Sequence, residues 1–219
     1  MRAIALAAPR DRPLRLLCLG AHCDDIEIGC GGTILALARH EPRLAVDWVV
    51  LSGDDARARE AERSADAFLA GVATRSLAVE RFRDGFLPYH GERVKDYFEA
   101  LKARVDPDVV FAPYRGDWHQ DHRFVSELAW STFRDHVILE YETPKYDPEP
   151  DGAPNLLVPI DDDVAEAKVR HLLEAYPSQA SKPWFTRDVF LGALRLRGVQ
   201  ARSRFAEGFH ARKLVLTVP

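Results

Sequence analysis

Short apolar runs alternate along this chain with longer segments in which apolar residues recur at helical spacing. Runs of roughly four to eight apolar or β-branched residues are typical of strands buried on both faces of a sheet. Apolar residues that recur every three or four positions, with charged residues between them, indicate amphipathic helices. The expected strands are Leu16–Leu19, Leu44–Leu51, Ser76–Val79, Asp108–Ala112 and Val137–Tyr141. The expected helices are Ile28–His40, Ala56–Leu69, Val94–Arg104 and Val164–Ala175.

This alternation favours an α/β fold. Strands joined through helices form right-handed βαβ units, so we expect a mostly parallel sheet in a Rossmann-like three-layer arrangement. The last third is less regular: Pro144–Pro154 is a proline-rich loop, Phe190–Gly198 fits a helix or a strand, and Lys213–Val218 fits a closing strand. Because no repeat or linker interrupts the chain, we expect a single domain over residues 1–219, in which residues 1–13 are a loose lead-in.

Charge and composition narrow the classes of function. The formal net charge of −4 argues against a nucleic-acid-binding protein, which is usually basic. No apolar run approaches the roughly 20 residues of a transmembrane helix, and the apolar patch near the N-terminus is shorter than the core of a signal peptide. The three cysteines, an odd number, offer no disulfide framework and fit a reducing compartment. We therefore expect a cytoplasmic protein.

Two clusters of histidines and carboxylates stand where predicted strands end. The first is Ala21-His22-Cys23-Asp24-Asp25, which follows the strand over Leu16–Leu19. The second is Asp117-Trp118-His119-Gln120-Asp121-His122, which follows the strand over Asp108–Ala112. In parallel sheets ligands bind beyond the carboxyl ends of the strands, so both clusters fall where a site is expected.

The side chains of the two clusters suit a catalytic metal ion. Catalytic zinc takes three protein ligands and keeps its remaining position for water or substrate. His22, Asp25 and His122 supply such a set, with two imidazoles and one carboxylate. Asp24 then lies beside the metal, where its free carboxylate can accept a proton from the activated water.

The second cluster adds two further candidates. If His122 binds the metal, His119 lies on the substrate side, where it would stabilise an oxyanion or protonate the leaving amine. Asp121 would accept a hydrogen bond from an imidazole and fix its tautomer. We expect His119 to be its partner, with the protonated form of that imidazole favoured.

Structural interpretations compete with this chemistry. An Asp-Asp pair before a helix is often an N-cap, and a single histidine is usually a surface or core residue. The glycines of Gly29-Cys30-Gly31-Gly32 come too far after the strand for a dinucleotide-binding turn, so we interpret them as a close packing face of the first helix. Cys23 and Cys30 are interpreted as packing residues rather than as metal ligands.

These motifs resemble the PIG-L/LmbE-like metal-dependent deacetylases. The family's Ala-His-Pro-Asp-Asp motif corresponds to Ala21–Asp25, with Cys23 in place of the proline, and its His-x-Asp-His motif to His119–His122. Weaker matches extend the resemblance from about Leu16 to about Phe209. They are Arg59-Glu60-Ala61-Glu62, Asp106-Pro107-Asp108-Val109-Val110, the set Lys168, Tyr176, Ser178 and Gln179, and Ala206-Glu207-Gly208-Phe209.

The resemblance implies a hydrolase that removes the acetyl group from an N-acetylglucosamine-type sugar conjugate. It implies one divalent metal, zinc first, with Fe²⁺ or another divalent ion as the alternative. The implied roles are metal ligand for His22, Asp25 and His122, general base for Asp24, and oxyanion or leaving-group partner for His119, oriented by Asp121.

The resemblance also implies contacts to substrate. Arg59 and Asp84 match positions that contact sugar hydroxyls in the family, although Arg59 also fits a helix-surface pair with Glu62. Cys23 places a thiol near the metal, so sensitivity to oxidation is a further expectation.

Two other functions remain open at this point. One is a metal-dependent amidase or deacylase that acts on a non-sugar N-acyl natural product or metabolite, about which the motifs say nothing. The other is a nucleotide-binding module without hydrolase chemistry, which would bind nucleotide without metal and leave the histidine clusters unexplained. The oligomeric state is open as well, and a homo-oligomer is compatible with the sequence.

Overall fold

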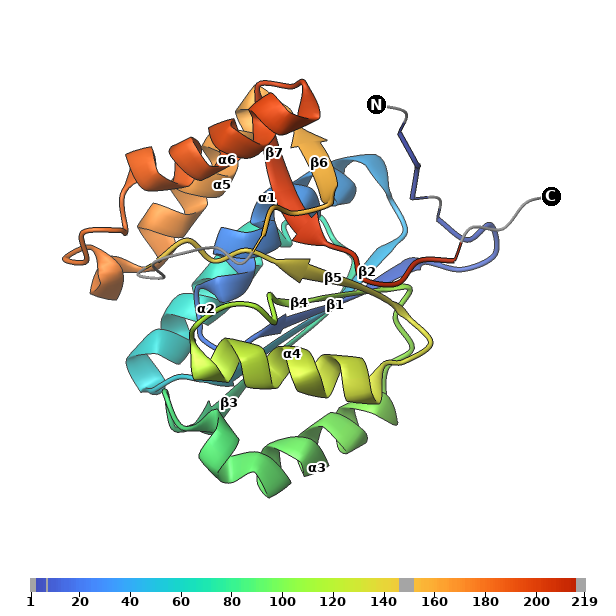
Figure 1. Cartoon of the computed structure of the whole chain (residues 1–219), viewed down its shortest axis with the longest axis vertical. Helices are drawn as coiled ribbons and strands as arrows, with labels where there is room; N and C mark the ends of the chain where they lie inside the picture. Colours follow the sequence, from blue (N-terminus) through green and yellow to red (C-terminus); the bar gives the residue numbers. More distant parts are fainter. Residues whose placement is uncertain (1–2, 7, 146–151, 216–219) are drawn as a thin grey trace.

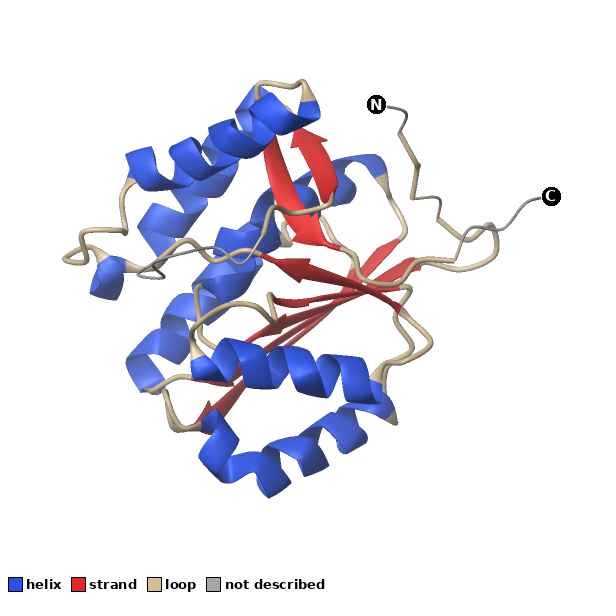
Figure 2. Cartoon of the chain, in the orientation of Figure 1, coloured by secondary structure: helices blue, strands red, loops and turns tan. Residues whose placement is uncertain are grey.

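The computed structural model describes residues 3–6, 8–145 and 152–215, and within them seven strands form one sheet (Figure 1, Figure 2). The strands are β1 (Leu14–Gly20), β2 (Leu44–Ser52), β3 (Thr74–Phe82), β4 (Val109–Pro113), β5 (Val137–Tyr141), β6 (Leu156–Ile160) and β7 (Phe205–His210). The helices are α1 (Asp25–His40), α2 (Asp55–Phe68), α3 (Gly91–Lys102), α4 (Gln120–Thr132), α5 (Asp162–Ala175) and α6 (Arg187–Ala201), with short 3₁₀ helices η1 (Leu87–His90) and η2 (Pro177–Gln179).

The order of the strands is β3-β2-β1-β4-β5-β7-β6. The first five of these pair in parallel, whereas β7 runs antiparallel to both β5 and β6. The carboxyl ends of β1 and β4, which pair directly, therefore meet at one edge of the sheet. The Rossmann-like α/β fold with a mostly parallel sheet, expected from the sequence, is confirmed.

Helices cover both faces of the sheet and produce three layers (Figure 1). Along β1, Leu16 and Cys18 pack in the core that includes side chains of α1, α2 and α5. Leu17 and Leu19 point the other way, into the core that includes α3 and α4. All four side chains are fully buried, as in a strand that is covered on both faces. None of the helices in the described ranges is long and apolar enough to cross a membrane.

The five predicted strands and four predicted helices all occur, with ends shifted by a few residues. The segment Phe190–Gly198, which fitted a helix or a strand, lies inside α6. Residues 213–215 form no strand, so that part of the expected closing strand is wrong, and residues 216–218 lie outside the described ranges. Of the expected proline-rich loop, residues 144–145 and 152–154 are irregular, and residues 146–151 lie outside the described ranges.

Helix α4 and strands β6 and β7 were not predicted from the sequence. The first turn of α4 contains residues of the second polar cluster, whose chemistry masked their helical pattern. β6 is apolar but contains Pro159, which disfavours the interior of a strand, and β7 is interrupted by the buried polar residues Glu207 and His210. Tertiary contacts therefore override local propensity in these segments.

Helix α1 begins at Asp25 and packs closely against its neighbours through its glycines. A Cβ atom added at Gly29 would lie 2.0 Å from the ring of Tyr141, and one added at Gly31 would lie 2.5 Å from the ring of Phe68. Only glycine allows this approach, so the interpretation of the glycine run as a packing face is confirmed.

A buried ion pair between Lys168 of α5 and Glu207 of β7 secures α1 from the other side. The Lys168 Nζ and Glu207 Oε1 atoms are 2.6 Å apart, and both side chains are almost fully buried. Lys168 also donates to the Ile28 carbonyl at 2.7 Å. The Glu207 carboxylate accepts hydrogen bonds from the backbone N–H groups of Gly32 and Thr33, each at 2.7 Å. Lys168 and Glu207, which belong to the weaker sequence matches to the family, thus have a structural role.

We expect Glu207→Gln to lower the free energy of unfolding by about 3–5 kcal/mol, because it leaves the Lys168 ammonium buried without a counter-charge. Urea denaturation measures this loss. The double variant Lys168→Met/Glu207→Gln removes the cation as well and should recover part of it. Glu166→Gln, which breaks an exposed pair with Arg187, is the control and should change stability by less than about 1 kcal/mol. Equal effects of the two single substitutions would contradict the prediction.

Candidate metal centre and active site

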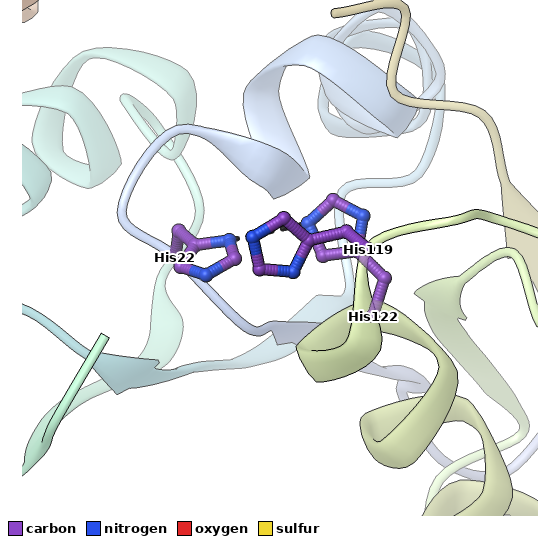
Figure 3. A group of neighbouring side chains, drawn as sticks. All are labelled: His22, His119 and His122. Atoms are coloured by element: carbon purple, nitrogen blue, oxygen red, sulfur yellow. Dashed lines mark hydrogen bonds between the residues drawn. The ribbon is translucent and has the colours of Figure 1, made fainter. Parts of the chain in front are cut away.

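The two polar clusters come together because β1 and β4 are neighbours in the sheet. His22 and Asp24 lie in the turn after β1, and Asp25 is the first residue of α1. His119 caps α4 after β4, and His122 lies in the first turn of that helix. Figure 3 shows the three imidazoles of the two clusters turned toward one another.

Three side-chain atoms form a small triangle. His22 Nδ1 is 3.1 Å from His122 Nε2, and Asp25 Oδ2 is 3.2 Å from each of these nitrogens. Zinc bonds of about 2.0–2.1 Å to imidazole nitrogen place donor atoms roughly 3.3 Å apart around a tetrahedral ion. The spacing and the nitrogen and oxygen chemistry of the triangle therefore fit one zinc-sized divalent ion.

His119 offers an alternative third donor. Donor atoms of His22, His119 and His122 lie within 4.8 Å of one another, whereas those of the triangle that contains Asp25 lie within 3.2 Å. The shorter distances favour Asp25, and His119 is then left beside the ion. The ring centroids of His119 and His22 are 4.6 Å apart, which keeps His119 close enough to reach a substrate there.

Carboxylates hold the outer nitrogen of both candidate ligands. His122 Nδ1 donates to Asp117 Oδ2 at 2.6 Å, and Thr143 Oγ1 donates to the same carboxylate oxygen at 2.9 Å. His22 Nε2 lies 3.3 Å from Asp121 Oδ2 and 3.1 Å from Asp84 Oδ1. Such outer partners fix the tautomer and the ring orientation of metal-binding histidines. They leave His22 Nδ1 and His122 Nε2, the triangle atoms, free to bind.

The electrostatics of the triangle favour positive charge. Burial alone would lower the pKa of His22, but Asp25, Asp121 and Asp84 raise this pKa well above its usual range. Burial alone would raise the pKa of Asp25, but His122, Lys145 and His22 hold it well below its usual range. A buried carboxylate and two imidazoles that prefer to carry charge form a place where a cation is stabilised.

Two cations hold the side chain of Asp24, which lies next to the triangle. Arg57 Nη2 is 3.1 Å from Asp24 Oδ2, and Lys145 Nζ is 3.0 Å from Asp24 Oδ1. Lys145 also donates to Asp25 Oδ1 at 2.8 Å, the oxygen that faces away from the triangle. Glu60 accepts from Arg57 at 3.0 Å and from the Ser178 hydroxyl at 2.6 Å. These contacts fix the orientation of the Asp24 carboxylate.

His119 is oriented by backbone rather than by the Asp121 carboxylate. The Nδ1 atom of His119 accepts a hydrogen bond from the backbone N–H of Asp121 at 3.2 Å. The backbone N–H of His119 donates to Asp117 Oδ1 at 2.7 Å. Burial, together with the neighbouring charges of His22 and His122, lowers the pKa of His119 to about 4. The lowered pKa favours the neutral imidazole at pH 7, and because Nδ1 accepts a hydrogen bond, Nε2 is the nitrogen left to carry the proton.

The expected partnership of Asp121 with His119 takes another form in the structure. The Asp121 carboxylate accepts backbone N–H groups of Gly85 at 2.8 Å and Leu87 at 3.1 Å, and it contacts His22. It therefore joins the loop that contains Asp84 to the metal site. The protonated His119 that the sequence analysis favoured does not agree with the lowered pKa of this imidazole.

The structure brings one of the two expected sugar-contacting residues to the site. Asp84 contacts His22 and keeps 76% of its side chain exposed, where a substrate can reach it. Arg59 lies exposed on α2, and the arginine that reaches Asp24 is Arg57. Arg57 and Glu60 form the same Arg-x-x-Glu spacing, two residues earlier than Arg59 and Glu62. Burial of Glu60 distinguishes the two, which sequence alone does not reveal.

Three further residues contact the candidate site and were not assigned a role from the sequence: Asp117, Thr143 and Lys145. Asp117 belongs to the second polar cluster, and its position two residues before His119 is the sequence feature that could have identified it. Thr143 and Lys145 follow β5, and no polar cluster in the sequence marks the end of that strand.

Cys23 is buried, its thiol donates to the Ser52 carbonyl at 3.4 Å, and burial raises the pKa of the thiol to about 12. A thiol in this state is unreactive, which opposes the expected sensitivity to oxidation.

We expect Asp117→Asn to weaken zinc binding by about 10–100-fold, because the substitution removes the charge that holds His122. Competition with a chromogenic chelator measures the affinity. Asp106→Asn is the matched control, since Asp106 is 78% exposed and remote from the triangle. Equal zinc affinities of the two variants would show that Asp117 does not support the ligand.

Comparison with known proteins places both clusters inside a recognised family region. A family model described as PIG-L: GlcNAc-PI de-N-acetylase matches residues 17–133. The uncharacterized deacetylase YaiS of Escherichia coli (strain K12) is 29% identical over 148 residues, which cover 64% of this chain and 80% of that protein.

Two solved structures share the fold over most of their length. The conserved protein TT1542 from Thermus thermophilus superimposes with a TM-score of 0.75 and 27% identity, over 94% of this chain and 98% of that one. The N,N'-diacetylchitobiose deacetylase from Pyrococcus horikoshii gives a TM-score of 0.71 and 25% identity, over 90% of this chain and 83% of that one.

Proposed function

The chain belongs to the PIG-L family of deacetylases, and from this premise we propose that it is a metal-dependent hydrolase that releases acetate from an N-acetylated sugar conjugate. The observation that carries the proposal is the triangle of His22, Asp25 and His122 with the carboxylate of Asp24 beside it. The similarity to a chitobiose deacetylase supports a sugar amide as the substrate class. The free, buried cysteines support a reducing compartment such as the cytoplasm.

His22, Asp25 and His122 would hold the metal ion, for which zinc is our first choice. A divalent ion in such a site polarises an amide carbonyl and lowers the pKa of water. The two imidazoles keep the net charge of the ligand set at minus one, so the ion retains positive charge for this work.

Asp24 would act as the general base. Arg57 and Lys145 orient its carboxylate, and each carboxylate oxygen keeps a lone pair for a further proton donor. It would take a proton from the attacking water and return it to the leaving nitrogen. The balanced reaction breaks the amide C–N bond, forms a C–O bond with water, and releases a carboxylate and an ammonium group.

His119 would stabilise the charge that develops on the carbonyl oxygen. Its Nδ1 is occupied by a backbone N–H group, so the neutral ring presents Nε2–H as a donor. A positioned donor of this kind is worth about 10²–10³-fold in rate in other hydrolases. Asp84 on the exposed side would contact the sugar, and Arg59 remains a candidate for that role only if substrate extends along α2.

Acetate release from a panel of N-acetylated sugars tests the proposal. We expect hydrolysis of at least one N-acetylglucosamine conjugate, loss of activity after dialysis against a chelator, and recovery when zinc or iron is restored. Activity that survives complete metal removal, or no acetate release from any sugar amide by the metal-loaded protein, would refute it. Tight nucleotide binding by the metal-free protein would favour the binding-module alternative.

A further inference from the structure

A cavity of about 400 Å³ lies beside the metal site, between α6, β7 and the segments that follow β4 and β5. This volume falls in the range of roughly 300–1,000 Å³ that small-molecule sites occupy. Two residues that line the cavity also contact the residues of the site. Asp117 holds His122, and Lys145 holds Asp24 and Asp25.

The lining of the cavity suits an apolar ligand. Helix α6 contributes Val189, Phe190 and Leu194, and Ile28 of α1 faces them. The charged residues of the wall are already paired within the protein. Arg197 forms two hydrogen bonds of 2.6 and 2.7 Å with Glu142, and Lys168 binds Glu207. Paired charges demand no counter-charge from a ligand, and apolar walls gain from burying one.

The exposed residues near His22 and His119 that do not line the cavity have a different character. Asp84 there is largely exposed, and Trp118 and Tyr89 expose 65% and 72% of their surfaces. Exposed aromatic rings and a carboxylate suit a polar sugar, which can stack and donate hydrogen bonds. The surroundings of the metal site therefore differ: exposed polar and aromatic side chains near Asp84, and apolar walls in the cavity.

We propose that the cavity binds the acyl group of the substrate and that the enzyme accepts linear acyl chains longer than acetyl. The inference rests on the proposed hydrolysis and specifies its substrate as an N-acyl amide with an aliphatic chain. An acetyl methyl group is about the size of one water molecule, so it would leave most of the cavity unused. Hydrolysis breaks the amide C–N bond with water and leaves the fatty carboxylate next to the Lys145 ammonium.

The test compares glucosamine amides whose acyl group grows from acetyl through butanoyl to hexanoyl. Burial of each added methylene is worth about threefold to fourfold in binding, so we expect kcat/KM to rise at least about tenfold from acetyl to hexanoyl. Calorimetric titration should likewise show that hexanoate binds the purified protein at least about tenfold more tightly than acetate.

A variant that fills the cavity sharpens the test. Gly192 lines the cavity from α6, and a Cβ atom added there meets nothing within 4 Å. Gly192→Leu should fold, since leucine favours a helix, and should lower the ratio of hexanoyl to acetyl kcat/KM at least about tenfold. Val199→Leu places the same side chain on the exposed surface of α6, outside the cavity, and should leave that ratio unchanged.

The outcomes separate the inference from the proposed function. Hydrolysis of the acetyl amide with no gain for longer chains would overturn the inference and leave the deacetylase assignment standing. A higher kcat/KM for an octyl glycoside of N-acetylglucosamine, without a higher kcat/KM for longer acyl groups, would indicate that the cavity binds the sugar side of the substrate. This result would also overturn the inference. Failure to hydrolyse any of the amides would refute both.

Discussion

We expect Asp24→Asn to keep the metal ion and to lose about 10²–10⁴-fold in kcat. Asparagine has nearly the shape of aspartate but cannot accept a proton from water. Asp24 is not part of the triangle formed by His22, Asp25 and His122, so the ligand set should stay intact. The substitution therefore separates proton transfer from metal binding.

Acetate release and metal content, measured on the same preparation, check this expectation. Asp66→Asn is the matched control because Asp66 is 75% exposed on α2 and should leave both quantities unchanged. Thermal unfolding of both variants shows whether loss of the ion pairs with Arg57 and Lys145 disturbs the fold. A metal-loaded Asp24→Asn protein that turns over at nearly the original rate would move the role of general base to another residue.

Arg57 illustrates why part of the site was hidden in the sequence. Arg57 and Arg59 both begin an Arg-x-x-Glu spacing, and they stand two positions apart on α2. Residues two apart on a helix point to nearly opposite faces. If the motif is assigned two residues too late, an arginine on the solvent side is taken for the one on the buried side. The burial of Glu60 and its hydrogen bonds with Ser178 show that the pair Arg57 and Glu60 faces the site. These contacts depend on a segment that lies more than a hundred residues away in the sequence.

The meeting of the two polar clusters, in contrast, was predictable because it follows from the topology of the sheet. His22 and Asp25 follow β1, His122 follows β4, and parallel neighbours bring their carboxyl ends to one edge. The partners of Asp121 were not predictable in this way. Its carboxylate binds the backbone at Gly85 and Leu87, in a loop after β3 whose path no local pattern reveals.

The strongest effect on metal content is expected from the ligands themselves. We expect His122→Ala and Asp25→Asn to fall from about one bound ion per chain to almost none, while His119→Gln keeps its ion. Loss of a ligand should weaken binding well beyond the roughly 10–100-fold that loss of an outer partner costs. Elemental analysis after gentle purification, followed by zinc titration, measures the stoichiometry and the affinity.

The comparison of Asp25 with His119 decides between the donor set that contains Asp25 and the set of three histidines. Asp25 Oδ2 lies 3.2 Å from both histidine donors, whereas the three histidines place their donor atoms within 4.8 Å of one another. If the tighter triangle holds the ion, His119→Gln keeps the metal and loses about 10²–10³-fold in kcat as the oxyanion donor. If His119→Gln loses the metal and Asp25→Asn keeps it, the ligand set is the three histidines, and the oxyanion role of His119 falls with it.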